Sequence, residues 1–382
     1  MTPRRSITVL VAAVTFAIVS GRATRAQSTQ KIERAWPVMG TMFVATVWGT
    51  DSVAMLRGVQ AARDSVRLVD SLMSTYRPTS EISRVNDSAG GIPQRVSPQT
   101  MHVLLHAKRL WIASGGLFDP TVGPLVRAWG FQGDSGAVPS SARLDSLRAL
   151  VGYQRVELDS AQGAVCLTRA GVRLDLGGIA KGYALDLARA ALTDPRITGG
   201  MVDLGGNVLV FGRPPTGTQW VIGIRHPRYA DRVLGTVSLD SGAVATSGDY
   251  EHFIRVRGVR YGHLIDPFTG YPRRGVMAAT AIGPRGEWSD GVSGTLFLAG
   301  ARRGAEIADS LPGVGGVWML DRGRDQVRLA DIVSSRRARE TFHFTVTGCS
   351  DTSSRRARRT SRPPVDRRHG SRSLRSDEGD CA

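Results

Sequence analysis

The chain has 382 residues and a formal net charge of +17, from 50 basic and 33 acidic side chains. Nearly all the basic residues are arginines that are dispersed along the chain, apart from a cluster at the C-terminus. Dispersed arginines indicate a compositional bias more than a nucleic-acid-binding face, so a nucleic-acid partner is not expected. The three cysteines lie far apart, with no metal-ligand spacing, and predict neither a zinc site nor a disulfide framework.

Residues 1–26 have the pattern of a secretory signal peptide. Arg4 and Arg5 supply a positive start, Ile7–Val19 is apolar, and Ala26 ends a segment suited to cleavage. The apolar run is short for a membrane span, which makes an uncleaved anchor the alternative. We expect an exported protein, periplasmic if the cell has an outer membrane, with inner-membrane association if the signal is retained.

The two ends of the chain enclose one domain, expected at residues 33–333, because no linker-like segment divides this part. From residue 334 to 382, Ser and Arg dominate, with Pro and Asp among them, and predict a disordered tail. One short apolar piece of this tail, Phe342–Val346, could pair as an edge strand.

Helices and strands interleave along the domain. The first predicted helix is Ser52–Met73, the second has Ser97 as its N-cap and stops at Gly115-Gly116, and the third begins near Ser140. Cys166 lies in an apolar run and is expected in the core. The strands are predicted at Met42–Trp48, Arg155–Leu158, Ala164–Thr168, Met201–Phe211, Trp220–Arg225, Gly235–Leu239, Phe253–Val256 and Met277–Ile282. Without a strict βαβ alternation, this order favours a single large α+β domain with mixed or antiparallel sheets and packed helices.

Leu174–Leu187, LDLGGIAKGYALDL, is the most informative segment. It predicts a strand, a glycine turn and a helix, with Asp175 before the turn and Lys181 in the first helical turn. A helix N-terminus with a nearby ammonium group suits a phosphate. The segment is neither a Walker loop nor a GxGxxG fingerprint, and its DLGG recurs at Asp203–Gly206. The two glycine turns either face one ligand or are simply tight turns.

Two later segments carry further candidates. A hairpin around Arg257-Gly258 should bring Ser247-Gly248 and Tyr250 near His263, which is either a binding residue or an ordinary strand histidine. Asp290 precedes Gly291 at the expected start of a helix and is either its N-cap or a carboxylate ligand for Mg²⁺.

These pieces, in this order, resemble the ApbE family of FAD:protein FMN transferases. The similarity runs from about residue 36 to 300. Its segments are Met39-Gly40-Thr41, Ser74–Asn86, Phe118–Pro124, Leu174–Ala184, Asp203–Asn207, Ala245–Gly248, His263–Pro272 and the acidic segment at Asp290. The resemblance implies an α+β tunnelling-type fold and an enzyme that uses FAD and Mg²⁺. Such an enzyme moves FMN onto a Thr or Ser hydroxyl of an acceptor protein, typically a membrane redox subunit, and releases AMP.

The resemblance also implies roles for single residues. Asp175 and Lys181 should flank the pyrophosphate, and the Gly178 carbonyl and the Asp290 carboxylate should hold Mg²⁺. Contacts to FAD are expected from Met39, Tyr76, Leu117, Phe118, Asp119, His263 and Ile265. Family members usually offer a threonine hydroxyl or another oxygen four residues after the metal aspartate, where this chain has Gly294 between Ser293 and Thr295. One of these neighbours, or water, would then complete the metal site.

For the reaction, Lys181 and the helix N-terminus would add positive potential at the diphosphate. His263 and Asp290 are both candidates to accept the proton of the attacking hydroxyl, and the sequence does not choose between them. Three alternatives stay open. One is an FAD pyrophosphatase that gives FMN and AMP, one is a non-catalytic flavin-binding protein, and one is a nucleic-acid binder acting through the tail.

Overall fold

A computed structural model of the chain describes residues 29–131, 136–323 and 328–347. Its centre is an eight-stranded sheet whose named neighbours are all antiparallel. In spatial order the strands are β1 (Gln30–Val38), β2 (Thr41–Gly49), β6 (Ile197–Leu204), β7 (Asn207–Gly212), β10 (Gly242–Gly248), β13 (Val276–Gly283), β14 (Gly315–Leu320) and β15 (Ile332–Ser334).

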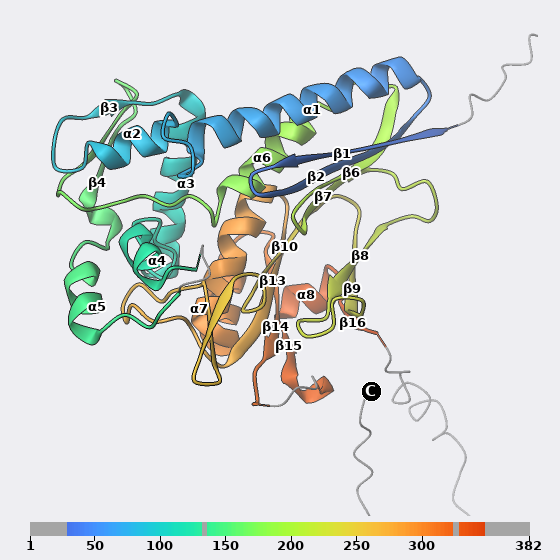
Figure 1. Cartoon of the computed structure of the whole chain (residues 1–382). Coiled ribbons are helices and arrows are strands. Elements are labelled where there is room, and N and C mark those ends of the chain that lie inside the picture. Colours follow the sequence, from blue (N-terminus) through green and yellow to red (C-terminus); the bar gives the residue numbers. More distant parts are fainter. Residues whose placement is uncertain (1–28, 132–135, 324–327, 348–382) are drawn as a thin grey trace, which may run out of the picture.

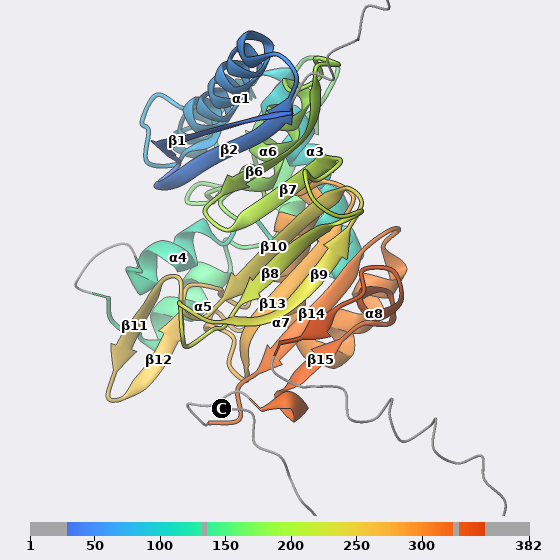
Figure 2. The same cartoon turned by 90° about the vertical axis from the view of Figure 1, so that its right-hand side faces the viewer.

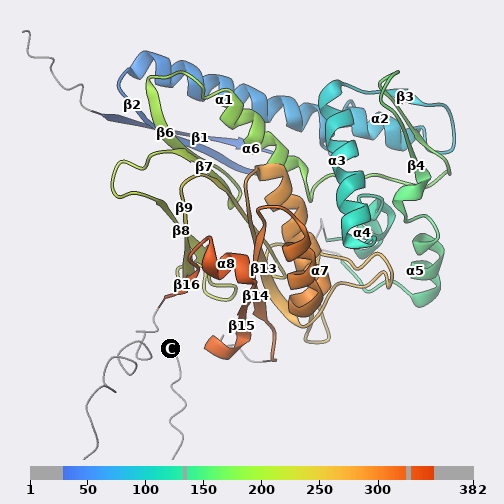
Figure 3. The ribbon, with the colours of Figure 1, turned by 180° about the vertical axis from the view of Figure 1, so that it is seen from behind.

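Three helices cover one face of this sheet: α1 (Ser52–Met73), α6 (Ala180–Ala190) and α7 (Gly286–Ser310). Figures 1 and 3 show α1 along the β1–β2–β6 end and α7 along β10, β13 and β14. One face of α1, with Val59, Val66 and Val69, is buried in the main core, and Asp51 caps its first turn. This core holds α6 and α7 side by side, and their N-termini form the candidate site.

The other face of the large sheet is covered by a small sheet of β8 (Trp220–Arg225), β9 (Val233–Leu239) and β16 (Thr345–Val346), as Figure 2 shows. Trp220, Val237, Met277 and Val317 are among the residues that fill the space between the two sheets. The domain therefore has three layers, with helices, the large sheet and the small sheet in that order.

The remaining elements form a lobe beside α7 (Figure 1). Trp129 anchors it, donating from Nε1 to the carbonyl oxygen of Gly270 at 2.9 Å. The lobe comprises α2 (Glu81–Asp87), β3 (Gln94–Arg95), α3 (Pro98–Ser114), α4 (Gly123–Trp129), α5 (Ser141–Arg148), β4 (Val156–Asp159), β5 (Ala164–Leu167) and the hairpin β11 (Phe253–Val256) and β12 (Val259–Gly262).

The predicted α+β class with substantially antiparallel pairing is confirmed, but the longest predicted strand is wrong. Met201–Phe211 is not a single strand, because β6 and β7 are joined by a tight turn at Gly205-Gly206. Both glycines have positive φ values, 64° and 87°, which reverse the chain direction. Because apolar residues continue on both sides of the turn, the sequence pattern indicated one strand and not a reversal of chain direction.

The domain extends past residue 333, where the sequence predicted the disordered tail to begin. The short helix α8 (Arg336–Glu340) packs against β14 with Ala338 buried, and β16 adds an edge strand to β9, as Phe342–Val346 suggested. Ser335 caps α8 and also accepts the N–H of Gly316 at 2.9 Å. Tertiary packing therefore orders a segment whose composition indicated disorder.

Two further predictions concern Cys166 and the possible membrane-spanning or exported segments. Cys166 is only half-buried, because Val165 and Leu167 on either side of it point into the core, so its predicted core position is wrong. The predicted signal peptide at residues 1–26 lies outside the described residues. Within the described ranges, every helix is too short or too polar to cross a membrane.

Candidate active site

The site is built where the N-termini of α6 and α7 meet. A Cβ atom at Gly182 would lie 2.1 Å from the carbonyl oxygen of Gly286, and a Cβ at Gly286 would lie 2.3 Å from the carbonyl oxygen of Gly182. Neither contact is possible for a larger residue, so the two backbones touch through these glycines. The close approach places the first turns of both helices within reach of each other's side chains.

Each helix supplies a carboxylate to the N-terminus of the other. Oδ2 of Asp290 on α7 accepts the N–H of Gly182 at 2.9 Å. The two oxygens of Asp186 on α6 accept the N–H groups of Gly286 and Glu287 at 2.8 and 3.0 Å. The alternative that Asp290 caps its own helix is wrong, because α7 begins at Gly286 and Asp290 lies beyond its first turn.

Asp290 carries a charge that its surroundings do not neutralise. The residue is 6 % exposed, and Gly182 N–H is the one hydrogen-bond donor to its carboxylate within the described residues. The same part of the chain offers it no lysine, arginine or histidine at ion-pair distance. A buried carboxylate is costly without a positive partner, so this position favours a bound cation.

The turn before α6 holds Lys181 beside the same helix start. Asp175 accepts the N–H of Gly177 through Oδ1 at 2.8 Å, and Lys181 donates from Nζ to the Gly177 carbonyl at 3.1 Å. The predicted strand before this turn is wrong: Leu174–Leu176 forms no strand, and a buried Asn86 holds Leu174 in place. The turn itself presents Gly177 and Gly178 at the surface.

Phe118 links this turn to α7. Its ring edge would lie 3.6 Å from a Cβ on Gly178 and 3.7 Å from a Cβ on Gly291. The ring thus packs against two glycines, one from the turn at Gly177-Gly178, which is the expected phosphate turn, and one directly after Asp290. Of the residues expected at the site, Phe118, Gly178 and Asp290 are brought together here from three separate segments.

Ser293 and Gly294 face β10. Ser293 Oγ hydrogen-bonds the Oγ of Ser247 at 2.8 Å and donates to the Asp290 carbonyl at 2.9 Å. A Cβ on Gly294 would meet Ser247 Oγ at 3.8 Å, an ordinary contact. Thr295 instead donates to the Gly291 carbonyl, with its side chain buried. The hydroxyl groups of Ser247 and Ser293 therefore bond to each other beside the Asp290 backbone, whereas that of Thr295 does not reach it.

His263 follows the β11–β12 hairpin, which forms around Arg257-Gly258 as predicted. Burial lowers the pKa of His263 to about 4, with further lowering by His252 and by Lys181. Its Nδ1 lies 3.2 Å from the carbonyl oxygen of His252. The imidazole is therefore neutral near pH 7, with Nδ1–H donating to this carbonyl and Nε2 free to accept a proton.

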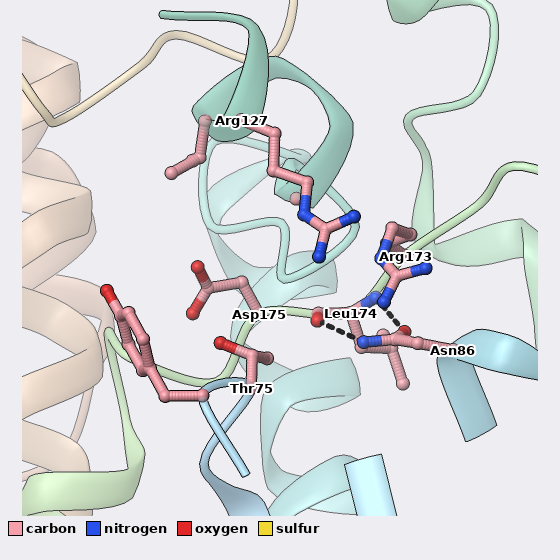
Figure 4. Close-up of a pocket in the computed structure, with 9 residues that line it drawn as sticks. Thr75, Asn86, Arg127, Arg173, Leu174 and Asp175 are labelled. Atoms are coloured by element: carbon pink, nitrogen blue, oxygen red, sulfur yellow. Dashed lines mark hydrogen bonds between the residues drawn. The ribbon is translucent and has the colours of Figure 1, made fainter. Parts of the chain in front are cut away.

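Tyr76 and Asp175 line one small hollow of about 50 Å³ beside the phosphate turn. Figure 4 shows the side chains of Arg127 and Arg173 at the same hollow and Asn86 bonded to the backbone of Leu174. This hollow is far too small for a dinucleotide. Tyr76, with 72 % of its surface exposed, is nevertheless free to contact a ligand that lies across the turn.

The remaining expected contact residues face other parts of the fold. Leu117 is buried in the main core, and Ile265 is buried in the cluster around Trp129. Asp119 turns inward, where it accepts the N–H groups of Thr121 and Tyr153, and burial raises its pKa. Their roles toward FAD, like those of the other site residues, stay predictions.

Met39 lies in the two-residue turn between β1 and β2 and has an unusual positive φ of 52°. The second DLGG segment adjoins this hairpin, because a Cβ on Gly205 would lie 2.7 Å from Thr41 Oγ1. The two DLGG turns differ in shape: Gly205 and Gly206 have positive φ values, whereas Gly177 and Gly178 do not. The same four-residue sequence therefore forms two turns of different backbone conformation.

A polar cluster behind the helix crossing was missed by the sequence reasoning. Glu287 is bonded to His102 Nε2 at 2.8 Å and lies 3.3 Å from Arg285. His106 lies 3.8 Å from Glu287, packs edge-on against Trp288, and has a buried Nε2 with no hydrogen-bond partner among the described residues. The available signal was the pair of histidines four residues apart on α3, which share one helix face.

The buried His106 predicts a stability loss at mildly acidic pH. Burial lowers its pKa to about 4, against the opposing attraction of Glu287. The unfolded chain therefore binds a proton near pH 6.5 that the folded state takes up only near pH 4. Its contribution is complete above pH 6.5 and is lost as pH falls to about 4, by on the order of 3 kcal/mol. Urea unfolding at a series of pH values should show this decline.

His106→Leu should flatten the decline, because the titrating group is gone. The exposed His343 offers a control, and His343→Asn should leave the pH dependence as in the parent protein. An equally steep decline in His106→Leu would contradict the assignment. His263 and His226, whose pKa values are also lowered by burial, should contribute to the decline that remains.

The described residues contain no group of three or more His, Cys, Asp or Glu side chains suited to a metal ion. The hydroxyl groups of Ser293 and Ser247 lie next to the Asp290 backbone and are oxygen donors. Mg²⁺ takes few protein oxygen ligands and keeps several waters alongside phosphate oxygens.

Several known proteins are similar to this chain. The FAD:protein FMN transferase of Vibrio cholerae is 32% identical over 74% of this chain and 85% of that protein. The FAD:protein FMN transferase of Treponema pallidum is 30% identical over 79% of this chain and 90% of that protein. Among solved structures, the ApbE protein of Thermotoga maritima matches with a TM-score of 0.72 and 32% identity, covering 80% of this chain and 97% of that one.

A second solved structure, the flavinyl transferase ApbE of Pseudomonas stutzeri, matches with a TM-score of 0.71 and 28% identity, covering 82% of this chain and 97% of that one. The model of the ApbE family matches residues 39–318. This range includes both helices of the crossing and the turn before α6. The chain therefore belongs to the ApbE family.

Proposed function

We propose that this protein is an FAD:protein FMN transferase. It would transfer FMN from FAD to a threonine or serine hydroxyl of an acceptor protein in a Mg²⁺-dependent reaction that releases AMP. The observation that carries the proposal is the buried, uncompensated carboxylate of Asp290, held at the α6 N-terminus next to Lys181. Family membership and relatives named for this activity support it.

In this proposal the diphosphate of FAD lies across the turn at Gly177-Gly178. The α6 N-terminus offers positive potential there, and Lys181 adds a full positive charge. Tyr76, which is exposed beside Asp175, would contact another part of the same ligand. These groups orient the FMN phosphorus toward an incoming hydroxyl.

The residues that would hold Mg²⁺ are Asp290, the Gly178 carbonyl and the hydroxyl of Ser293. When bound, the ion supplies positive charge that offsets charge developing on the diphosphate oxygens. Asp290 fits this role because one of its oxygens is committed to Gly182 N–H and the other accepts no hydrogen bond from the described chain. Ser293 and Ser247 offer the oxygen that Gly294 lacks.

The proton of the attacking hydroxyl would go to His263. Nε2 of this imidazole is unprotonated near pH 7. The Asp290 carboxylate, in contrast, accepts the N–H of Gly182 with one oxygen and would bind the cation with the other. The acceptor oxygen then bonds to the FMN phosphorus, the bond from this phosphorus to the AMP oxygen breaks, and AMP leaves. A base with so low a pKa takes the proton only as the new bond forms.

The test is incubation of the protein with FAD, Mg²⁺ and a threonine-bearing acceptor subunit, followed by mass spectrometry of the acceptor peptides. A stable FMN adduct with release of AMP is the expected result. Free FMN and AMP without an adduct would identify a pyrophosphatase instead. A yellow protein that leaves FAD intact would identify a flavin-binding protein, and either outcome would reject the transferase.

The glycine at position 294 leads to a separate prediction. Gly294→Thr should lower the Mg²⁺ concentration for half-maximal transfer severalfold, because it supplies a hydroxyl oxygen where a Cβ has room. The matched control is Gly294→Ala, which adds the Cβ and the helix propensity without the oxygen. Magnesium titrations of the two variants that coincide would remove Gly294 from the metal site.

We further propose that the protein acts outside the cytoplasm, where the segment at residues 1–26 would direct it. The acceptor would be a subunit of a membrane redox complex. Fractionation of cells that carry the full-length protein tests the first point, and covalent flavin fluorescence on a gel of membrane proteins tests the second. Flavin-labelled bands that persist after deletion of this protein would contradict the acceptor assignment.

A further inference from the structure

Asp186 is the counterpart of Asp290 across the helix crossing. It lies four residues after Gly182 in α6, as Asp290 lies four residues after Gly286 in α7. Its carboxylate oxygens accept the first two N–H groups of α7, at 2.8 and 3.0 Å. Arg285, the residue at the N-cap position of α7, provides no side-chain cap. The start of α7 is therefore held by a side chain from α6.

We propose that Asp186 is a positioning residue that fixes the carboxylate of Asp290 for metal binding. The inference rests on the proposed function, since it takes Asp290 as the metal ligand. Asp290 is joined to Gly286 by one turn of rigid helix, so a displacement of the α7 start moves Asp290 with it. A displacement of about 1 Å would break the 2.9 Å bond to Gly182 N–H.

The geometry requires a carboxylate at position 186. Two adjacent backbone N–H groups point at two oxygens, and an asparagine would direct its own NH₂ group at one of these donors. Asp186 is also nearly buried, with 11% of its side chain exposed and Arg285 Nε 3.6 Å away. Water therefore has little access to replace a lost hydrogen bond.

The polar cluster behind the crossing reinforces this arrangement. Glu287, whose N–H is bonded to Asp186, is held by His102 at 2.8 Å and by Arg285 at 3.3 Å. His102 also stacks on Tyr183 of α6, with ring centroids 5.1 Å apart. The first turn of α7 is thus tied to α6 and α3, and the free oxygen of Asp290 is left for a ligand.

The first test measures amide hydrogen exchange at Gly182 in the ligand-free protein. Asp186→Asn should speed this exchange at least tenfold, because Asp290 no longer holds the N–H of Gly182. The matched control is Asp51→Asn, since Asp51 also accepts two backbone N–H groups, both at 2.9 Å, but at the start of α1. The control should leave Gly182 unchanged. Unaltered exchange at Gly182 in Asp186→Asn would overturn the proposal.

The second test measures Mg²⁺ affinity by calorimetry with FAD present. Asp186→Asn should weaken Mg²⁺ binding about 10- to 100-fold, as losses of groups that orient a metal ligand do. FAD affinity of Asp186→Asn without Mg²⁺ should stay within about twofold, because the substitution acts through the metal ligand. Both affinities of Asp51→Asn should also stay within about twofold, because Asp51 caps α1 and not α6 or α7. Unchanged Mg²⁺ binding in Asp186→Asn would overturn the proposal even if the variant were less stable.

The two tests separate this inference from the proposed function. If exchange at Gly182 responds to Asp186→Asn but the parent protein binds no Mg²⁺, the transferase mechanism fails while the positioning of Asp290 stands. If Asp186→Asn does not fold, Asp186→Glu serves instead. Glutamate keeps the negative charge but displaces both carboxylate oxygens by the length of one methylene group. Faster exchange at Gly182 and weaker Mg²⁺ binding are therefore expected in this variant too.

Discussion

Asp290→Asn is expected to slow FMN transfer about a thousandfold, a loss of about 4 kcal/mol of transition-state stabilisation. Asparagine has the same shape and keeps an oxygen that can accept the N–H of Gly182, so the helix crossing should survive. The substitution removes only the negative charge that is buried without a cationic partner. The measurement is the rate of adduct formation at saturating FAD over a range of Mg²⁺ concentrations.

The control for this variant is Asp240→Asn, which makes the same chemical change at an exposed position. It should transfer FMN at the parent rate. Asp290→Asn should still bind FAD to within a few-fold of the parent, as judged by quenching of flavin fluorescence. A normal rate in Asp290→Asn at low Mg²⁺ concentration would remove this residue from the reaction.

Lys181→Met is expected to have the second largest effect, with transfer slowed about a hundredfold, or about 3 kcal/mol. Methionine has nearly the length of lysine and retains the packing of its stem, but it lacks the ammonium group beside the phosphate turn. The lost hydrogen bond to the Gly177 carbonyl lies at an exposed position and has little effect on folding. Rates and FAD affinity should both fall, because the charge acts on the bound diphosphate and on the departing AMP.

The chain provides its own control for this change, since it contains only Lys31 and Lys108 besides Lys181. Lys108 is exposed on α3, so Lys108→Met removes one positive charge without touching the turn. It should leave the rate unchanged. Equal losses in the two variants would mean that net charge, rather than the position of Lys181, supports the reaction.

Some of the fold could be predicted because its signals are local. The caps at Asp51 and Ser97 and the glycine after α3 define α1 and α3, whose observed limits are those expected. The hairpin at Arg257-Gly258 followed from its turn residues in the same way. Such elements depend on contacts between residues close in the chain, which the amino-acid order specifies directly.

Other features were missed because their signals are not local. The strands β1, β10 and β14 were not predicted, and the α8 segment was expected to be disordered. Small residues such as Ala243 dominate in β10, and two glycines, one of them Gly316, begin β14, so the usual strand pattern is weak there. These segments are ordered by partners across the sheet, and those partners lie elsewhere in the sequence.

The sequence by itself determined the α+β class and the family resemblance, and it predicted Lys181 and Asp290 as the charged residues of a phosphate site. Only the tertiary structure decided which group the carboxylate of Asp290 contacts. Its carboxylate accepts the N–H of Gly182, which lies 108 residues earlier in the chain. Asp186 of α6 in turn accepts the N–H of Gly286 at the start of α7. No local pattern encodes this pair, because it exists only where two glycines let the helix backbones touch.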